Sequence, residues 1–145
     1  MSRLLTVENL VFLAGLGQLL LALGSIYIPY VLKWREELVK LRPLTRQVFW
    51  TYAAYILCIN LSFGLLSTLG TKLITDRSSL AAVVTGFITA YWATRVMIQF
   101  FYFDRSAAPQ GRRFILAEIA LNTLFIFFTI VYGYTTYFNI YGCCQ

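Results

Sequence analysis

The chain has 145 residues, of which 59% are hydrophobic, 17% aromatic and only 12% charged, and its formal net charge is +6. About a quarter of the residues of an ordinary soluble domain are charged, so this composition excludes a soluble globular domain, a disordered tail and a small disulfide scaffold. We therefore interpret the chain as an integral membrane protein.

The first long apolar run extends from Leu10 to Leu32 and is long enough to cross a hydrocarbon core of about 30 Å. Small residues at 22–25 resemble the cleavage site of a secretory signal peptide. However, the apolar run continues past that site, and Glu8 weakens the basic leader that a signal peptide needs. These features favour a retained membrane helix.

A mixed segment follows the first run, in which charged residues alternate with apolar ones. Trp34, Leu38 and Leu41 recur there at helical spacing until Pro43 ends the pattern. We predict an amphipathic extension of the first helix that lies against the membrane surface.

Three further apolar runs cover residues 48–70, 80–103 and 114–137, and each is long enough to span a bilayer. Short connections join the runs, so sequential helices should be antiparallel neighbours. The predicted fold class is an all-α membrane protein, an antiparallel bundle of four transmembrane helices with short loops. Residues 1–145 form a single membrane domain in this interpretation.

The basic residues are unevenly distributed between the two sides of the bundle, eight against three. Because lysine and arginine favour cytoplasmic loops, the first and third loops are predicted to be cytoplasmic and both termini to lie on the other side. The basic loops should then contact anionic lipid headgroups, which makes nucleic-acid binding a poor explanation of the charge. The eight are Lys33, Arg35, Lys40, Arg42, Arg46, Arg105, Arg112 and Arg113, and the three are Arg3, Lys72 and Arg77.

Aromatic residues gather at the predicted inner interface, where tryptophan and tyrosine commonly anchor membrane helices. They include Tyr30, Trp34, Phe49 and Trp50. We interpret them as an anchoring belt.

Small residues mark the faces on which membrane helices are expected to touch, because burying leucine against leucine gains nothing over lipid. The third span carries such a stripe on one side and polar residues on the other, so it should be engaged on two sides. This arrangement favours a homo-oligomer or a protein partner. The expected packing residues are Gly17, Gly24, Gly64, Ala82, Gly86 and Ala90.

A polar cluster is expected between the third and fourth spans. At 1.5 Å per residue, Arg95 and Asn122 lie about 12 Å inside their ends of the spans, and Gln99 and Glu118 about 6 Å. Pairing with Glu118 would make Arg95 tolerable, since an unpaired arginine near the bilayer centre costs about 3 kcal/mol. Alternatively, Arg95 extends to the inner interface and Glu118 lies near the headgroups. Both interpretations stay open here.

Two further polar residues belong to the candidate site. Asn60 lies near the middle of the second span, where it either joins helices by hydrogen bonding or lines a cavity. Tyr91 brings a hydroxyl group into the bundle from the third span.

Several kinds of chemistry are excluded by residue type. The chain has no histidine, which removes imidazole-based haem, zinc and di-iron sites and imidazole proton relays. It also has no Cys-x-x-Cys pair and no glycine-rich phosphate loop between a strand and a helix. We predict no cofactor and no metal site.

Three functions are compatible with these patterns. The favoured one is association, as a homo-oligomer or as a subunit or scaffold of a membrane complex. The alternative is a small transporter, or a protein that binds lipid or an anionic metabolite through Arg95 and its polar neighbours. A lipid-modifying enzyme would need Glu118 as a general base, a role that a neighbouring arginine opposes. The sequence therefore favours a non-enzymatic protein.

Overall fold

The computed structural model describes residues 6–31, 33–102 and 112–143. Within these ranges, four helical stretches are long and apolar enough to cross a membrane, namely Val7–Val31, Pro43–Leu69, Ser79–Phe101 and Ile115–Gly142. The predicted all-α fold class is confirmed, with four spans of an integral membrane protein. Of the predicted third loop at 104–113, residues 104–111 lie outside the described residues, and Arg112 and Arg113 belong to the last helix.

The first span consists of α1 (Val7–Ser25) and α2 (Ile28–Val31), and the short helix α3 (Trp34–Leu38) follows it. Lys33 precedes α3 in the left-handed region, with φ of 51°, where a non-glycine residue is uncommon. The expected amphipathic extension is therefore a separate short helix. Its Leu38 side chain is 7% exposed, whereas Arg35, Glu36 and Glu37 beside it are exposed.

The second span, α4 (Pro43–Leu69), begins at Pro43 rather than at residue 48. Proline fits the first turn of a helix because its missing N–H would have no partner there. The residue expected to end one helical pattern thus begins the next helix, which extends α4 beyond the apolar run.

A tight connection joins α4 to the third span through α5 (Thr71–Ile74). Ser78 caps α6 (Ser79–Phe101), and its side chain accepts a hydrogen bond from the Ala81 amide at 3.0 Å. Hydrogen bonds from the side chain and the backbone of Ser78 hold the pKa of Asp76 below its ordinary value. The connection is thereby ordered by local polar contacts.

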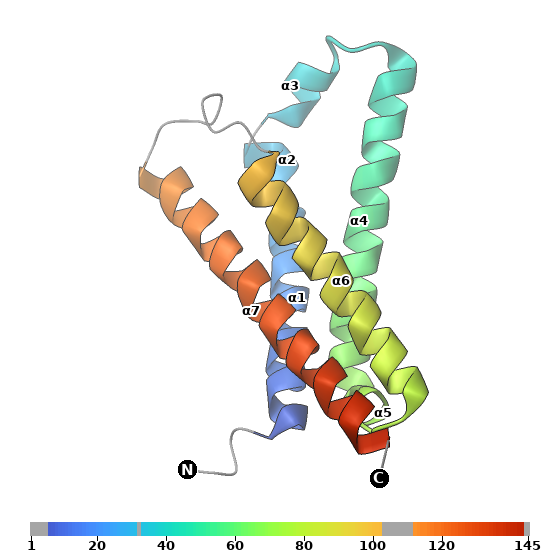
Figure 1. The fold of residues 1–145 in the computed structure, drawn as a ribbon. Helices are drawn as coiled ribbons and strands as arrows, with labels where there is room; N and C mark the ends of the chain where they lie inside the picture. The colour runs from blue at the N-terminus through green and yellow to red at the C-terminus, as the bar shows by residue number, and fades with distance from the viewer. Residues whose placement is uncertain (1–5, 32, 103–111, 144–145) are drawn as a thin grey trace.

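The helices pack as two pairs, α1 along α4 and α6 along α7 (Arg112–Cys143), and a shorter contact between α1 and α7 joins the pairs (Figure 1). Close approach within the first pair depends on glycine. A Cβ atom on Gly15 would lie 2.8 Å from Cβ of Ser67, and one on Gly64 would lie 2.8 Å from the Leu19 side chain. Only hydrogen fits at these two positions.

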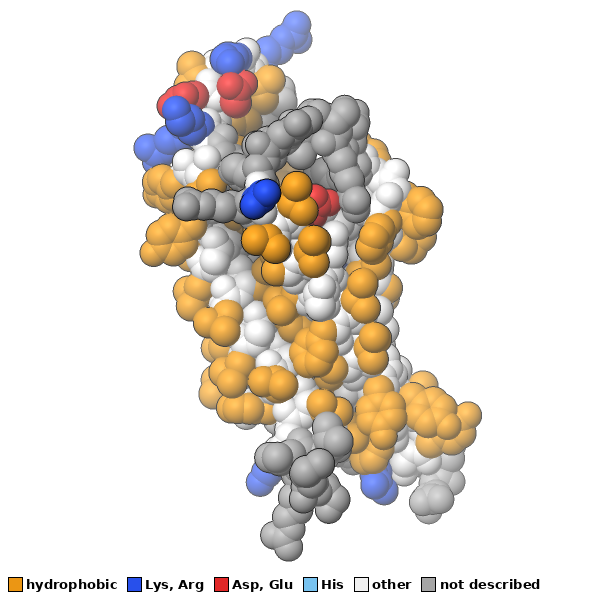
Figure 2. Space-filling model, turned by 90° about the vertical axis from the view of Figure 1, so that its left-hand side faces the viewer, with side chains coloured by type: hydrophobic (Ala, Val, Ile, Leu, Met, Phe, Trp, Pro, Cys, Tyr) orange, Lys and Arg blue, Asp and Glu red, His pale blue; other side chains and the backbone are white. Residues whose placement is uncertain are grey.

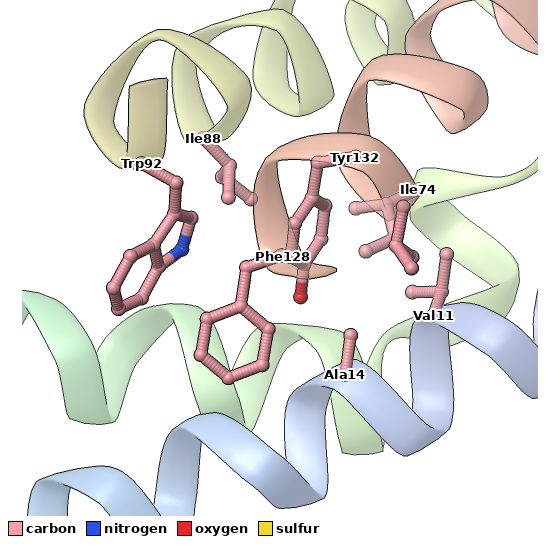
Figure 3. Close-up of a cluster of buried hydrophobic side chains, with 8 residues drawn as sticks. Val11, Ala14, Ile74, Ile88, Trp92, Phe128 and Tyr132 are labelled. Carbon is pink, nitrogen blue, oxygen red and sulfur yellow. The ribbon is translucent and has the colours of Figure 1, made fainter. Parts of the chain in front are cut away.

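The hydrophobic core lies where the two pairs meet, near the start of α1 and the end of α7 (Figure 3). Both of these helix ends lie at the same end of the bundle (Figure 1), while the side of the membrane on which they lie remains a prediction. The buried core residues are Val11, Ala14, Ile74, Ile88, Trp92, Phe128, Val131 and Tyr132.

Buried polar groups in the same half of the bundle bind one another. The Tyr132 hydroxyl accepts a hydrogen bond from Nε2 of Gln18 at 2.8 Å and lies 2.6 Å from Oγ of Ser67, so it joins three helices. Asn139 donates through Nδ2 to the carbonyl oxygen of Ile74 at 2.9 Å and accepts from the Arg77 amide at 3.3 Å. These contacts tie the core to the α5 connection.

The outer faces of the bundle are apolar. Figure 2 shows one long face, on which hydrophobic side chains gather along the middle and basic side chains lie toward the two ends. Leu20, Val83 and Ile130 belong to three different helices and are all exposed. Such a surface is favourable in hydrocarbon and unfavourable in water.

Candidate functional site

A pocket of about 730 Å³ opens between the α1–α3 segment and α4, and residues of α6 and α7 close its inner end. This volume falls within the range of about 300–1,000 Å³ that is typical of small-molecule sites. Trp92 belongs both to the hydrophobic core and to the pocket lining, so the pocket begins where the core ends.

The pocket walls are largely apolar and aromatic. The three tryptophans of the chain all line it, and the ring of Trp34 packs edge-on against Phe49, with 5.0 Å between ring centroids. This contact holds α3 against α4 at the outer end of the pocket. The aromatic lining residues are Tyr30, Trp34, Phe49, Trp50, Tyr52, Trp92 and Phe125, and the aliphatic ones include Leu21, Ile28, Ala53, Ile56 and Leu57.

Charge is distributed unequally between the mouth and the inner part of the pocket. Among the described residues, the charged ones in the lining are Lys33, Arg35, Glu36 and Arg95. Lys33 lies 4.0 Å from Glu36, and both side chains are about 70% exposed. The mouth is therefore a solvated, partly neutralised surface, while Arg95 is half-buried in the wall formed by α6.

Hydrogen-bond donors face the inner end of the pocket. Tyr91 donates to Oδ1 of Asn60 at 3.0 Å, and the guanidinium carbon of Arg95 lies 5.8 Å from the centroid of the Tyr91 ring. Asn60 is only 5% exposed and lines the pocket. Tyr91 occupies one acceptor site of the Asn60 oxygen, which leaves this amide one further acceptor site and two N–H donors. Asn60 and Arg95 together make this end rich in donors.

The structure brings together part of the expected polar cluster. Asn60 and Arg95 line one pocket, joined by Tyr91, whereas Gln99, Glu118 and Asn122 are not among the lining residues. Within the described ranges, the ion pairs at 4.0 Å or less are Lys33–Glu36 and Lys40–Glu37, so an Arg95–Glu118 pair is not among them.

Asn122 occupies a different environment on α7. Its Oδ1 atom is buried and has no hydrogen-bond partner among the described residues. Glu118, one turn earlier on the same helix, is half-buried. Neither side chain is among the lining residues, although Leu121 and Phe125 of the same helix line the pocket.

The expected packing residues have unequal surroundings. Gly64 is buried against Leu19, and a Cβ atom on Gly17 would lie 3.1 Å from the Phe128 ring. A Cβ atom on Gly86 would lie 3.6 Å from the methyl group of Thr136 on α7. Gly24 faces open space, Ala82 is half-buried and Ala90 is exposed.

Two features of the structure were missed by sequence reasoning. Gly15 makes a close approach of α1 to α4, and its occurrence among other small residues of the first span was the available signal. The aromatic residues at the inner interface also line the pocket, in addition to the anchoring role that their position predicts. Helical periodicity indicates which face of a helix is apolar, but it carries no signal for a cavity between helices.

The available donors suit an oxygen-bearing ligand. Within the described residues, no group of three or more histidine, cysteine, aspartate or glutamate side chains gathers to hold a metal ion. Guanidinium and amide N–H groups bind acceptor oxygens, and a guanidinium binds carboxylate or phosphate through two parallel hydrogen bonds.

Comparison of the chain with protein-family models, with curated proteins and with solved structures finds no match. The pocket and its side chains are therefore the basis for a functional proposal.

Proposed function

We propose that this is a lipid-binding membrane protein that holds an anionic amphiphile in the pocket between α1–α3 and α4. The observation that supports it is the half-buried Arg95 in the wall of an apolar pocket between membrane helices. An ionisable residue within a membrane span commonly marks a binding site or an ion pathway.

Both ends of an amphiphile find complementary surroundings in this pocket. An anionic group offsets the cost of placing Arg95 in the span, which insertion scales put at about 3 kcal/mol for an unpaired arginine at the bilayer centre. The aliphatic and aromatic walls give the hydrocarbon chain surroundings as apolar as lipid, so the chain can leave the bilayer for the pocket at little cost. The basic residues of the mouth attract anions from the membrane surface.

Native mass spectrometry of the protein released from lipid nanodiscs tests the proposal. The wild-type protein should retain the mass of an amphiphile, and Arg95→Gln should lose it while unfolding at the temperature of the ligand-free wild type. Arg46→Gln is the matched control, because Arg46 is exposed on α4 and does not line the pocket. An Arg95→Gln variant that retains the same mass as the wild type would contradict the proposal.

Association, which the sequence favoured, has less support from the contacts of its marker residue. Gly86 lies close to Thr136 of α7, so this part of the small-residue stripe serves packing inside the chain. The same mass spectrum counts subunits. A defined oligomer without retained ligand would favour association and count against lipid binding.

A further inference from the structure

The inner end of the pocket indicates the chemical class of the ligand. We infer that the ligand is a single-chain carboxylate, bound with its carboxylate group inward between Arg95 and Asn60 and its chain along the apolar wall. This inference rests on the proposed function and specifies it.

The first argument is the match between donors and acceptors. Asn60 lines the pocket and carries two N–H donors, its oxygen already accepts from Tyr91, and Arg95 has donors only. A carboxylate has two acceptor oxygens and no donor, so it satisfies both side chains at once. An amine has no charge complement beside Arg95, and an alcohol cannot supply the two acceptor oxygens that a guanidinium binds in parallel.

The second argument is charge balance. Arg95 is the charged lining residue remote from the solvated mouth within the described part of the chain. One carboxylate neutralises one guanidinium, which matters because an unbalanced charge is costly away from water. A phosphate monoester carries close to two negative charges at neutral pH and would leave an excess. The inner end therefore favours a monoanion.

The third argument is the shape of the pocket. Its lining extends along α4 from Phe49 to Asn60, which is roughly 16 Å at a rise of 1.5 Å per residue. Leu21 of α1 and Ala53 and Leu57 of α4 line it between these limits. A volume of about 730 Å³ drawn out over this length accommodates an extended hydrocarbon chain.

The mouth is a weaker place for the carboxylate. Lys33 is largely exposed and lies beside Glu36, and surface charges of this kind are screened by water and salt. Arg95 and Asn60 act where the surroundings are less polar, so the same hydrogen bonds are stronger there.

Tryptophan fluorescence offers a direct measurement, because all three tryptophans line the pocket. Brominated palmitic acid quenches tryptophan at short range, and unlabelled amphiphiles are then titrated as competitors in nanodiscs. Palmitic acid should displace the probe at a concentration at least about tenfold lower than 1-hexadecanol, which corresponds to one charge-assisted hydrogen bond. Hexadecyl phosphate should fall between the two.

Variants of Asn60 and of its hydrogen-bond partner Tyr91 test the inference further. Asn60→Leu should reduce the preference for palmitic acid over 1-hexadecanol about tenfold, and Tyr91→Phe should reduce it several-fold by releasing the Asn60 amide. Asn60→Asp retains an acceptor for Tyr91 while replacing the donor, so it should bind palmitic acid least well even if Asn60→Leu folds poorly. Tyr55→Phe is the matched control, since Tyr55 is exposed on α4 outside the pocket.

The outcomes separate this inference from the proposal on which it rests. Equal displacement by palmitic acid and 1-hexadecanol, with binding still lost in Arg95→Gln, would overturn the carboxylate assignment and leave lipid binding intact. Stronger displacement by hexadecyl phosphate than by palmitic acid would overturn the assignment as well. Quenching that no competitor reverses would overturn both.

Discussion

The two halves of the bundle use the same kinds of residue for different purposes. In the half that contains the start of α1 and the end of α7, the Tyr132 hydroxyl joins Gln18 and Ser67 inside a closed core. In the other half, Asn60 and Arg95 face a pocket. Buried polar groups stabilise the bundle where helices converge, and they become available to a ligand where helices diverge.

Backbone spacing explains this difference. Gly15 and Gly64 bring α1 and α4 close together, whereas the rings of Trp34 and Phe49 separate α3 from the same α4 helix further out. Small residues close one half of the molecule, and large aromatic residues support the open half.

Replacing Gly15 by a larger residue should cause the largest loss of stability. Gly15→Leu places a side chain where even a Cβ atom would lie 2.8 Å from Ser67, so α1 and α4 must separate. Overpacking of this kind costs about 1–3 kcal/mol or more in the free energy of unfolding. Unfolding in mixed detergent measures the loss. Gly24→Leu is the control, because Gly24 has no neighbour within 4 Å, and equal losses in the two variants would contradict the packing account.

A larger side chain in the pocket should weaken ligand binding without lowering the thermal stability of the protein. Ala53→Phe adds a ring to a half-buried lining position, where space is available in the open half. We expect the affinity for palmitic acid to fall at least about tenfold, equivalent to about 1.4 kcal/mol, with no loss of thermal stability in the ligand-free protein. Competition titration and thermal scanning measure the two quantities, and unchanged affinity would place the binding site elsewhere.

Removing the Tyr132 hydroxyl should lower the stability of the protein and leave ligand binding unchanged. Tyr132→Phe leaves Gln18 and Ser67 without their shared partner in the core, which should lower the free energy of unfolding by about 1 kcal/mol. Palmitic acid binding should be unaffected, because Tyr132 lies outside the pocket lining. Tyr134→Phe, at an exposed position on α7, provides the baseline. A selective loss of binding in Tyr132→Phe would show that the two halves are coupled.

The smallest effect on stability should come from replacing Asp76 in the connection between α5 and α6. The pKa of Asp76 is below its ordinary value, so its contribution to stability is present above that value and disappears as the pH falls through the folded-state pKa. Wild type should therefore unfold at a slightly higher temperature than Asp76→Asn at neutral pH. Thermal unfolding at acidic pH should show no difference, and a difference that persists there would exclude this contribution.

The spans were predictable from sequence, because a helix satisfies its own backbone inside hydrocarbon and needs about 20 consecutive, mostly apolar residues to cross it. The break between α2 and α3 was not predictable, since the left-handed conformation of Lys33 follows from how α3 folds back toward α4. The pocket depends on this break. Its existence therefore required the tertiary arrangement.

The candidate site was predictable in part. Arg95 stands out as the only charged residue well inside the third span. Its depth in the membrane, counted at 1.5 Å per residue, matched that of polar residues in the fourth span, which is the next helix in the chain. In the structure, however, Arg95 lies near the Tyr91 ring, and Tyr91 is hydrogen-bonded to Asn60 on α4. Depth along a helix does not determine which neighbouring helix a side chain faces.

The half of the bundle that contains the pocket is proposed to hold the hydrocarbon chain of an amphiphile. Photo-crosslinking in nanodiscs tests it most directly, with palmitic acid that carries a diazirine in its chain and mass spectrometry of the labelled peptides. The account predicts saturable labelling of the pocket wall from Ala53 to Asn60, which palmitic acid competes away and Ala53→Phe abolishes. Labelling spread over lipid-facing residues such as Leu20, Val83 and Ile130, with the same pattern in both proteins, would contradict it.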